Sequence, residues 1–111
     1  MLIVDDDAGF RARARRLLAL AGYDVIGEAV DGASAIAGVR ELDPDVVLLD
    51  VLLPDADGIE VAALLENGPA VVLTSSRDAA DYGRRLRAAK AGFIAKAELS
   101  PATFAAALEA A

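Results

Sequence analysis

The sequence predicts an α/β domain in which helices cover both faces of a parallel sheet. Short, strongly apolar runs recur along the 111 residues without alternating with polar residues, which is typical of strands buried on both faces. Segments with helical spacing separate these runs, and Gly, Pro and Ser fall at the boundaries. A chain of this length suits one domain with one core.

Five apolar runs are the expected strands. They are Leu2–Val4, Val25–Ile26, Val46–Leu49, Val71–Leu73 and Phe93–Ala95. Strands and helices alternate without any repeat or linker, and the crossovers of such sheets are right-handed. The predicted architecture is therefore a flavodoxin-like (βα)5 fold, a doubly wound parallel five-stranded sheet with the order 2-1-3-4-5.

The first expected helix covers residues 8–21. Its apolar side chains form one stripe, and the arginines within 11–16 are placed on its outer face. The members of the stripe are Phe10, Ala14, Leu17, Leu18 and Ala21. Gly22, Gly68-Pro69 and Gly92 follow three helical segments and are interpreted as C-terminal end signals.

The later helices are read from local signals. The Asp57-Gly58 turn leads into the third helix, and this turn is favoured over a calcium loop because the EF-hand ligand pattern is missing. For residues 81–90 an exposed face of the fourth helix is favoured over a basic recognition helix, because the chain is acidic and has no helix-turn-helix. Tyr82 and the arginines of 84–87 are candidates for a partner or dimer contact on that face. Ser100-Pro101 is an N-cap followed by proline, and it starts a helix over 102–111.

Composition excludes several classes of function. The chain has no Cys and no His, which excludes disulfides, Ser-His or Cys-His nucleophile pairs and imidazole zinc sites. A net charge of −7 argues against non-specific binding of nucleic acid. No apolar run reaches the roughly 18 residues of a membrane span, and no secretory signal is visible, so a cytoplasmic location is expected.

An acidic rim is predicted at the topological switch point. Asp5, Asp6 and Asp7 follow the first strand, and Asp50 ends the third, so all four lie at the carboxyl edge where such sheets bind ligands. Two anions about 4 Å apart repel by roughly 4 kcal/mol at an effective dielectric of about 20. A cluster of them suits Mg²⁺, although Asp7 fits a helix N-cap equally well.

Hydroxyl and cationic side chains are expected at the same rim. Thr74 and two serines end the fourth strand, and Lys96 follows the fifth. Each is unremarkable alone, since such hydroxyls are usually turns or caps and a single Lys is usually on the surface. Together they supply donors for the oxygens of a phosphoryl group, and Asp50 is a candidate carboxylate nucleophile.

With these residues assembled, the whole chain resembles a bacterial two-component response regulator receiver domain. The resemblance rests on "LIVDDD", "PDVVLLDVLLPDADG", "VVLTS" and "GFIAK" in this order. It implies that Asp50 is the phospho-acceptor and that Asp5, Asp6, Asp50 and the Leu52 backbone carbonyl bind Mg²⁺. It also implies that Lys96 pairs with the phosphoryl group and that Thr74 and Phe93 are the switch residues.

The resemblance further implies a phosphorelay function. The donor would be a sensor histidine kinase or a phosphotransfer protein, and phosphorylation would alter the face made by the fourth helix, fifth strand and fifth helix. A homodimer through that face is a family expectation. The domain would promote its own phosphorylation and dephosphorylation without being an enzyme, and it would bind neither nucleic acid nor membrane.

Three positions depart from the common family pattern. Ala97 stands where proline with a cis bond is frequent, so the Lys96–Ala97 bond is expected to be trans. Leu52 is apolar where many relatives carry a polar side chain, which predicts slow self-dephosphorylation. Phe93 lacks the hydroxyl of tyrosine, so its inward state gains packing without a hydroxyl hydrogen bond.

Other interpretations stay open at this point. A degenerate receiver that acts only as a docking module is compatible with Leu52 and Ala97. A Mg²⁺-dependent phosphatase-like enzyme usually has a second Asp two residues after the nucleophile, where this chain has Leu52. The 111 residues themselves are expected to hold one receiver domain and no output domain, as in a stand-alone regulator or a truncated multidomain protein.

Overall fold

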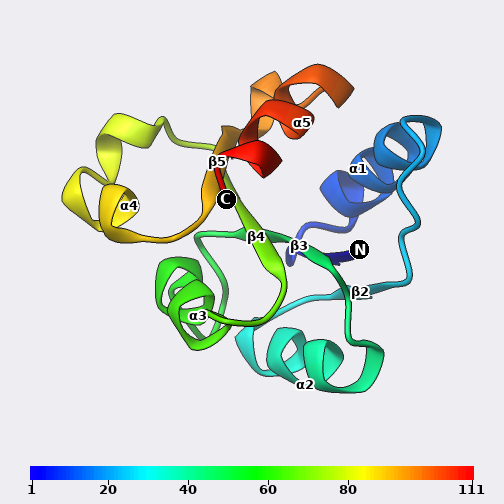
Figure 1. The fold of residues 1–111 in the computed structure, drawn as a ribbon, viewed down its shortest axis with the longest axis horizontal. Helices are drawn as coiled ribbons and strands as arrows, with labels where there is room; N and C mark the ends of the chain where they lie inside the picture. Colours follow the sequence, from blue (N-terminus) through cyan, green and yellow to red (C-terminus); the bar gives the residue numbers. More distant parts are fainter.

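A parallel sheet of five strands in the order β2-β1-β3-β4-β5 forms the centre of the fold, in a computed structural model that describes all 111 residues (Figure 1). The strands are β1 (Leu2–Val4), β2 (Gly27–Ala29), β3 (Val46–Asp50), β4 (Ala70–Ser75) and β5 (Gly92–Ala95). The predicted flavodoxin-like fold and strand order are confirmed.

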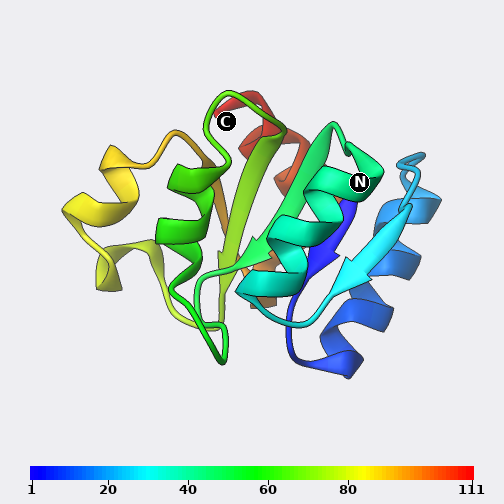
Figure 2. The ribbon, with the colours of Figure 1, turned by 90° about the horizontal axis from the view of Figure 1, so that it is seen from below.

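Helices lie on both sides of this sheet. They are α1 (Ala8–Leu20), α2 (Gly32–Leu42), α3 (Gly58–Leu64), α4 (Arg84–Ala88) and α5 (Pro101–Glu109), with short 3-10 turns at Ala79–Asp81 and Lys96–Glu98. Figures 1 and 2 show α1 and α5 on one face, α2 and α3 on the other, and α4 beyond α3 near the β5 edge. None of these helices is long and apolar enough to cross a membrane.

Each face of the sheet has its own apolar core. Phe10, Leu18 and Phe104 pack with Ile3 and Leu48 in the core beneath α1 and α5. The second core lies under α2 and α3, and its members include Leu2, Val4, Val47, Leu49, Ile59, Val61 and Leu73. Burial on both faces explains why the strands read as continuous apolar runs.

The second strand lies downstream of its predicted position. Val25–Ile26 is wrong as a strand, because the edge of β1 pairs with residues 27–29 in a parallel register that begins at Leu2↔Gly27. Ile26 only donates its N–H to the Met1 carbonyl oxygen at 2.9 Å, and its side chain is exposed. β2 is an edge strand with exposed Glu28 at its centre, so apolar content did not mark it.

The start of α1 and both ends of α5 follow the sequence signals closely. Asp7 caps α1 by accepting from the N–H groups of Gly9 and Phe10, which confirms its reading as a cap. Gly22 follows this helix with φ 96°, the left-handed geometry of an end signal. Ser100 caps α5, and the helix ends at Glu109, two residues before the predicted end.

Two other glycine end signals are wrong. After α3 the residue with positive φ is Asn67, at 74°, rather than Gly68. Gly92 is the first residue of β5, where a Cβ atom would lie 2.0 Å from the carbonyl oxygen of Ala107 in α5. Gly92 is therefore required by the close packing of α5 on the sheet, which sequence position alone does not reveal.

Gly58 fits the loop after β3 against the strand itself. Its N–H donates to the Val51 carbonyl oxygen at 2.7 Å, and a Cβ atom here would lie 2.1 Å from the carbonyl oxygen of Asp50. The carboxyl end of β3 is thus held in place by a residue without a side chain.

The variant Gly58→Ala is expected to lower the free energy of unfolding by about 3 kcal/mol, since backbone atoms must move to admit one methyl group. Gly22→Ala is the matched control, because no atom lies within 4 Å of its Cβ position and only backbone strain opposes it. That strain costs about 1 kcal/mol. Urea unfolding measures both, and equal losses would contradict this explanation of Gly58.

Candidate functional site

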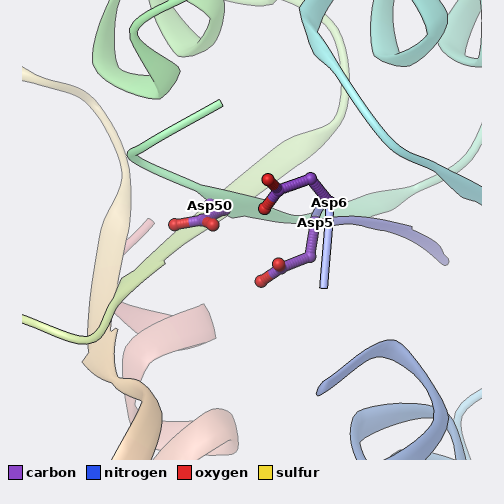
Figure 3. Close-up of side chains that lie close together, drawn as sticks. All are labelled: Asp5, Asp6 and Asp50. Carbon is purple, nitrogen blue, oxygen red and sulfur yellow. The ribbon is translucent and has the colours of Figure 1, made fainter. Parts of the chain in front are cut away.

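Three carboxylates gather at the carboxyl ends of the two central strands. Asp5 follows β1 and Asp50 ends β3, and the parallel register that pairs Val4 with Leu49 brings the two acids side by side. One oxygen from each of Asp5, Asp6 and Asp50 lies within 4.8 Å of the others. Figure 3 shows the three side chains lying close together. The predicted rim therefore exists, but without the Asp7 side chain, which caps α1.

Lys96 balances part of this negative charge. Asp5 and Asp50 are 0% and 4% exposed, whereas Asp6 is exposed. The Lys96 Nζ atom lies 2.7 Å from Asp5 Oδ2 and 3.2 Å from Asp50 Oδ2, donating a hydrogen bond to the latter. The contact with Asp5 is an ion pair without hydrogen-bond geometry, because Asp5 Oδ2 has no hydrogen-bond partner.

The ammonium group also lies over an aromatic ring. Lys96 Nζ is 4.7 Å from the centroid of Phe10, a buried residue in the first turn of α1. This cation–π contact and the two carboxylates fix the end of a long, flexible side chain. Lys96 therefore points into the acidic rim instead of into solvent.

Burial and charge shift two pKa values in the site. Desolvation, with repulsion from Asp5, raises the pKa of Asp50 above its ordinary 3.8 despite the opposing effect of Lys96. Burial acts to lower the pKa of Lys96, but its contacts with Asp5 and Asp50 outweigh this and raise it. Lys96 is therefore charged across the whole physiological range of pH, and Asp50 ionises at some cost to stability.

Thr74 brings an unsatisfied hydroxyl to the same place. It is the partner of Asp50 in the β3–β4 register, and its side chain is fully buried. Its Oγ1 atom has no hydrogen-bond partner, a costly state for a buried polar atom. Ser75 differs, since its hydroxyl bonds the Tyr82 hydroxyl at 2.5 Å and accepts from the Arg77 N–H at 3.0 Å.

The donor set fits a hard divalent cation. Three carboxylates and one ammonium leave two formal negative charges among oxygen ligands, the kind that Mg²⁺ prefers. Thr74 Oγ1 has no hydrogen-bond partner and Asp5 Oδ2 has only its ion pair with Lys96, so the protein alone does not fully satisfy the polar groups here. The Leu52 N–H donates to Asp50 Oδ1 at 3.2 Å, while the Leu52 carbonyl remains a predicted ligand.

The acids after Leu52 have structural roles. Asp55 accepts from the N–H groups of Gly32 and Ala33 at the start of α2, and these hydrogen bonds lower its pKa. Asp57 caps α3 and pairs with Arg85 of α4. For Asp57 desolvation acts to raise the pKa, but the hydrogen bonds from Arg85 and the Ile59 N–H, together with the charge of Arg85, outweigh it and lower the pKa. The predicted turn into α3 is confirmed.

The fourth helix is shorter than predicted. It covers Arg84–Ala88 instead of residues 81–90, because Ala79–Asp81 forms a 3-10 turn and Gly83 has φ 56°. Tyr82 is not on an exposed face of this helix. It is half-buried, with its ring centroid 6.1 Å from that of Phe93 on β5 and its hydroxyl bonded to Ser75.

The loop after β5 adopts the expected peptide geometry. The chain contains no cis peptide bond, so Lys96–Ala97 is trans as predicted, and Lys96–Glu98 forms a short 3-10 turn. Phe93 is half-buried at the edge of the core under α3. Its ring therefore lies between the core and solvent.

No pattern in the sequence indicates the role of Arg11. This residue was placed with its neighbours on the outer face of α1, but its Nη1 atom donates to the Asp5 carbonyl oxygen at 2.7 Å. Its Nε atom also donates to Glu28 of β2 at 2.9 Å. Only the spatial proximity of α1, β1 and β2 reveals these contacts.

Comparison with known proteins gives one consistent family. A sequence profile of the response regulator receiver domain matches residues 1–109. The DNA-binding response regulator MtrA of Mycobacterium tuberculosis is 41% identical over 101 residues, covering 86% of this chain and 43% of MtrA. The chemotaxis protein CheY of Thermotoga maritima is 33% identical over 100 residues, covering 86% of this chain and 83% of CheY.

Solved structures share the same fold. The signal receiver domain of NarL from Mycobacterium tuberculosis is 35% identical, with a TM-score of 0.82, covering 98% of this chain and 93% of that one. The chain spans 49% of a Pseudomonas aeruginosa relative and 43% of MtrA, about half the length of these curated relatives.

The raised pKa of Asp50 predicts a stability gain on neutralisation. In buffer with a chelator, Asp50→Asn is expected to raise the free energy of unfolding by about 1 kcal/mol at pH 7. A carboxyl group whose pKa is higher in the folded than in the unfolded protein lowers the free energy of unfolding as the pH rises. The loss begins at the ordinary pKa of 3.8 and is complete above the pKa of the folded protein. The gain should therefore be constant at neutral pH and vanish below pH 3.8.

Urea unfolding across this pH range measures the effect. Asp45→Asn, on an exposed acid, is the control and is expected to change little at any pH. A destabilised Asp50→Asn at neutral pH would show that the pairing with Lys96 outweighs desolvation and the repulsion from Asp5.

Proposed function

The chain belongs to the response regulator receiver domain family, and on that premise we propose that Asp50 accepts a phosphoryl group from a phosphohistidine donor. The donor is a sensor histidine kinase or a phosphotransfer protein, because this chain has no His of its own. One observation supports this proposal more strongly than the others do. The buried Thr74 hydroxyl has no partner, and it neighbours Asp50 on the adjacent strand.

The reaction is a transfer between two nucleophiles. An oxygen of Asp50 attacks phosphorus, the O–P bond forms as the N–P bond of the donor breaks, and the electron pair stays on the imidazole nitrogen. Lys96 and Thr74 donate to the phosphoryl oxygens on which negative charge accumulates. Lys96 is oriented beforehand by the two carboxylates and the Phe10 ring, so little reorganisation of this donor opposes the reaction.

A magnesium ion belongs to the same proposal. Asp5, Asp6 and Asp50 would hold it together with the Leu52 carbonyl, and when bound it would offset their charge and that of the phosphoryl group. The protein contributes the arrangement of these oxygens. Lys96 pairs with Asp5 and Asp50 and holds their carboxylates in place near that site.

The proposed switch runs through Thr74 and Phe93. A phosphoryl group on Asp50 would satisfy the Thr74 hydroxyl and draw it inward, leaving space near β5 that the Phe93 ring fills. Tyr82 packs against Phe93 and is bonded to Ser75, so it would follow this movement. The result would be a different α4-β5-α5 face for a protein partner or a second copy of this chain.

The wider role is proposed from the family. Residues 1–111 act as one receiver unit in the cytoplasm, without nucleic acid or membrane contacts of their own. The domain promotes its own phosphorylation and dephosphorylation and turns over no other substrate.

Incubation with Mg²⁺ and acetyl phosphate followed by intact-mass spectrometry tests the acceptor. Wild-type protein is expected to gain one phosphoryl group and Asp50→Asn none. Thr74→Val removes the orphaned hydroxyl at nearly constant volume and should slow the gain by about tenfold, whereas Thr74→Ser retains it. A docking module would gain no mass, and a gain that survives Asp50→Asn would mean that the acceptor is wrong.

Leu52 predicts a long-lived phosphoryl group. Its side chain is 52% exposed beside Asp50 and offers no polar group to orient water. Leu52→Asn, at this exposed position, is expected to speed the loss of phosphate by about tenfold. Mass spectrometry after removal of acetyl phosphate gives both rates, with Leu64→Asn as the control at a distant exposed leucine. Rapid loss from wild-type protein would contradict the prediction.

A further inference from the structure

We propose that Arg11 is a positioning residue for the acidic cluster, because it fixes the peptide between Asp5 and Asp6 and so directs the Asp6 carboxylate. This inference rests on the proposed magnesium site. Arg11 does not touch a reacting atom. It acts through the backbone of the residue that precedes Asp6.

The contacts of Arg11 are strong and specific. The Nη1 atom donates to the Asp5 carbonyl oxygen at 2.7 Å, and the Nε atom donates to Glu28 Oε1 at 2.9 Å. The side chain is 17% exposed, unlike that of Arg16 on the same helix. A charged donor held at both ends of its fork restrains the carbonyl more firmly than a neutral donor does.

Other contacts hold the remaining parts of Asp5. Its N–H donates to the Ala29 carbonyl oxygen at 3.0 Å, and its Oδ1 atom accepts from the Asp7 N–H at 2.9 Å. No backbone N–H reaches the Asp5 carbonyl, so Arg11 supplies its donor. Arg11 therefore completes the restraint on the peptide plane that leads to Asp6.

Asp6 depends on this restraint more than its neighbours do. Asp5 and Asp50 are buried and contact Lys96, but the side chain of Asp6 is exposed and makes no hydrogen bond or ion pair within the protein. Repulsion from the two buried carboxylates pushes it outward. Only the backbone geometry keeps its oxygen within 4.8 Å of theirs.

Glu28 reduces the repulsion that the Arg11 guanidinium would exert on a metal ion in the acidic cluster. It accepts from Arg11 through one oxygen and from Arg15 through the other, at 2.6 Å, and thereby ties β2 to α1. Its negative charge compensates the guanidinium near the acidic cluster. Lysine at position 11 would reach the carbonyl with one point charge, but it would lack the planar fork that also binds Glu28.

Titration with Mg²⁺, followed by amide NMR, tests the proposal by a binding constant. Arg11→Ala is expected to bind Mg²⁺ about tenfold more weakly than wild type, as ligand-supporting residues typically do when lost. Arg11→Lys should recover part of the affinity. Arg16→Ala, on the exposed side of the same helix, should bind like wild type.

Two further readouts separate positioning from stability. Arg11→Ala should lower the thermal unfolding temperature modestly relative to Arg16→Ala, because the Asp5 carbonyl loses its donor, yet stay folded at the temperature of the titration. With acetyl phosphate at saturating Mg²⁺, the phosphorylation rate of Arg11→Ala should return to the wild-type rate, since Asp50, Thr74 and Lys96 are intact.

Three results would overturn the inference. Equal Mg²⁺ affinity in Arg11→Ala and Arg16→Ala would refute the positioning role while leaving the proposed function standing. An affinity loss that merely follows a loss of folded protein would refute it as well. Absence of Mg²⁺ binding by wild-type protein would remove the proposed site and this inference together.

Discussion

Crowding of carboxylates at the switch point of the sheet is the constraint around which the other features are arranged. Two strands that must be adjacent for the fold to form each deliver an acid to the same edge, and both acids are buried. Lys96 forms ion pairs with both of them, and its ammonium group lies over the Phe10 ring. Without that cation the fold would carry buried, uncompensated charge, which proteins rarely tolerate.

The same arrangement leaves polar groups unsatisfied. The Thr74 hydroxyl and one oxygen of Asp5 are buried without hydrogen-bond partners, and Asp50 has a raised pKa. These are costs to stability, and they are concentrated where a phosphoryl group and a divalent cation would satisfy them. Ligands that satisfy these groups would therefore recover, on binding, stability that the folded protein lacks at this site.

Backbone and side-chain contacts connect this site to its surroundings. Gly58 packs directly on the end of β3, and Asp57 beside it caps α3 while pairing with Arg85 of α4. On the other side, Arg11 and Glu28 connect the Asp5 peptide to α1 and β2. The acidic cluster is therefore framed by elements from four different segments of the chain, which makes its geometry sensitive to changes far from it in sequence.

Local patterns determined much of this protein. Continuous apolar runs predicted a sheet covered on both faces, Asp7 and Ser100 marked helix starts, and the order of motifs placed Asp5, Asp50, Thr74 and Lys96 at one edge. These features depend on short-range chemistry, namely capping, burial and the shared direction of parallel strands. Tertiary structure alone decided the edge strand at residues 27–29, the need for Gly92 against α5 and the short α4. Tertiary structure also decided that Arg11 contacts the Asp5 carbonyl oxygen instead of lying on the outer face of α1. Such contacts join segments that are distant along the chain, so they leave no periodic pattern in the sequence.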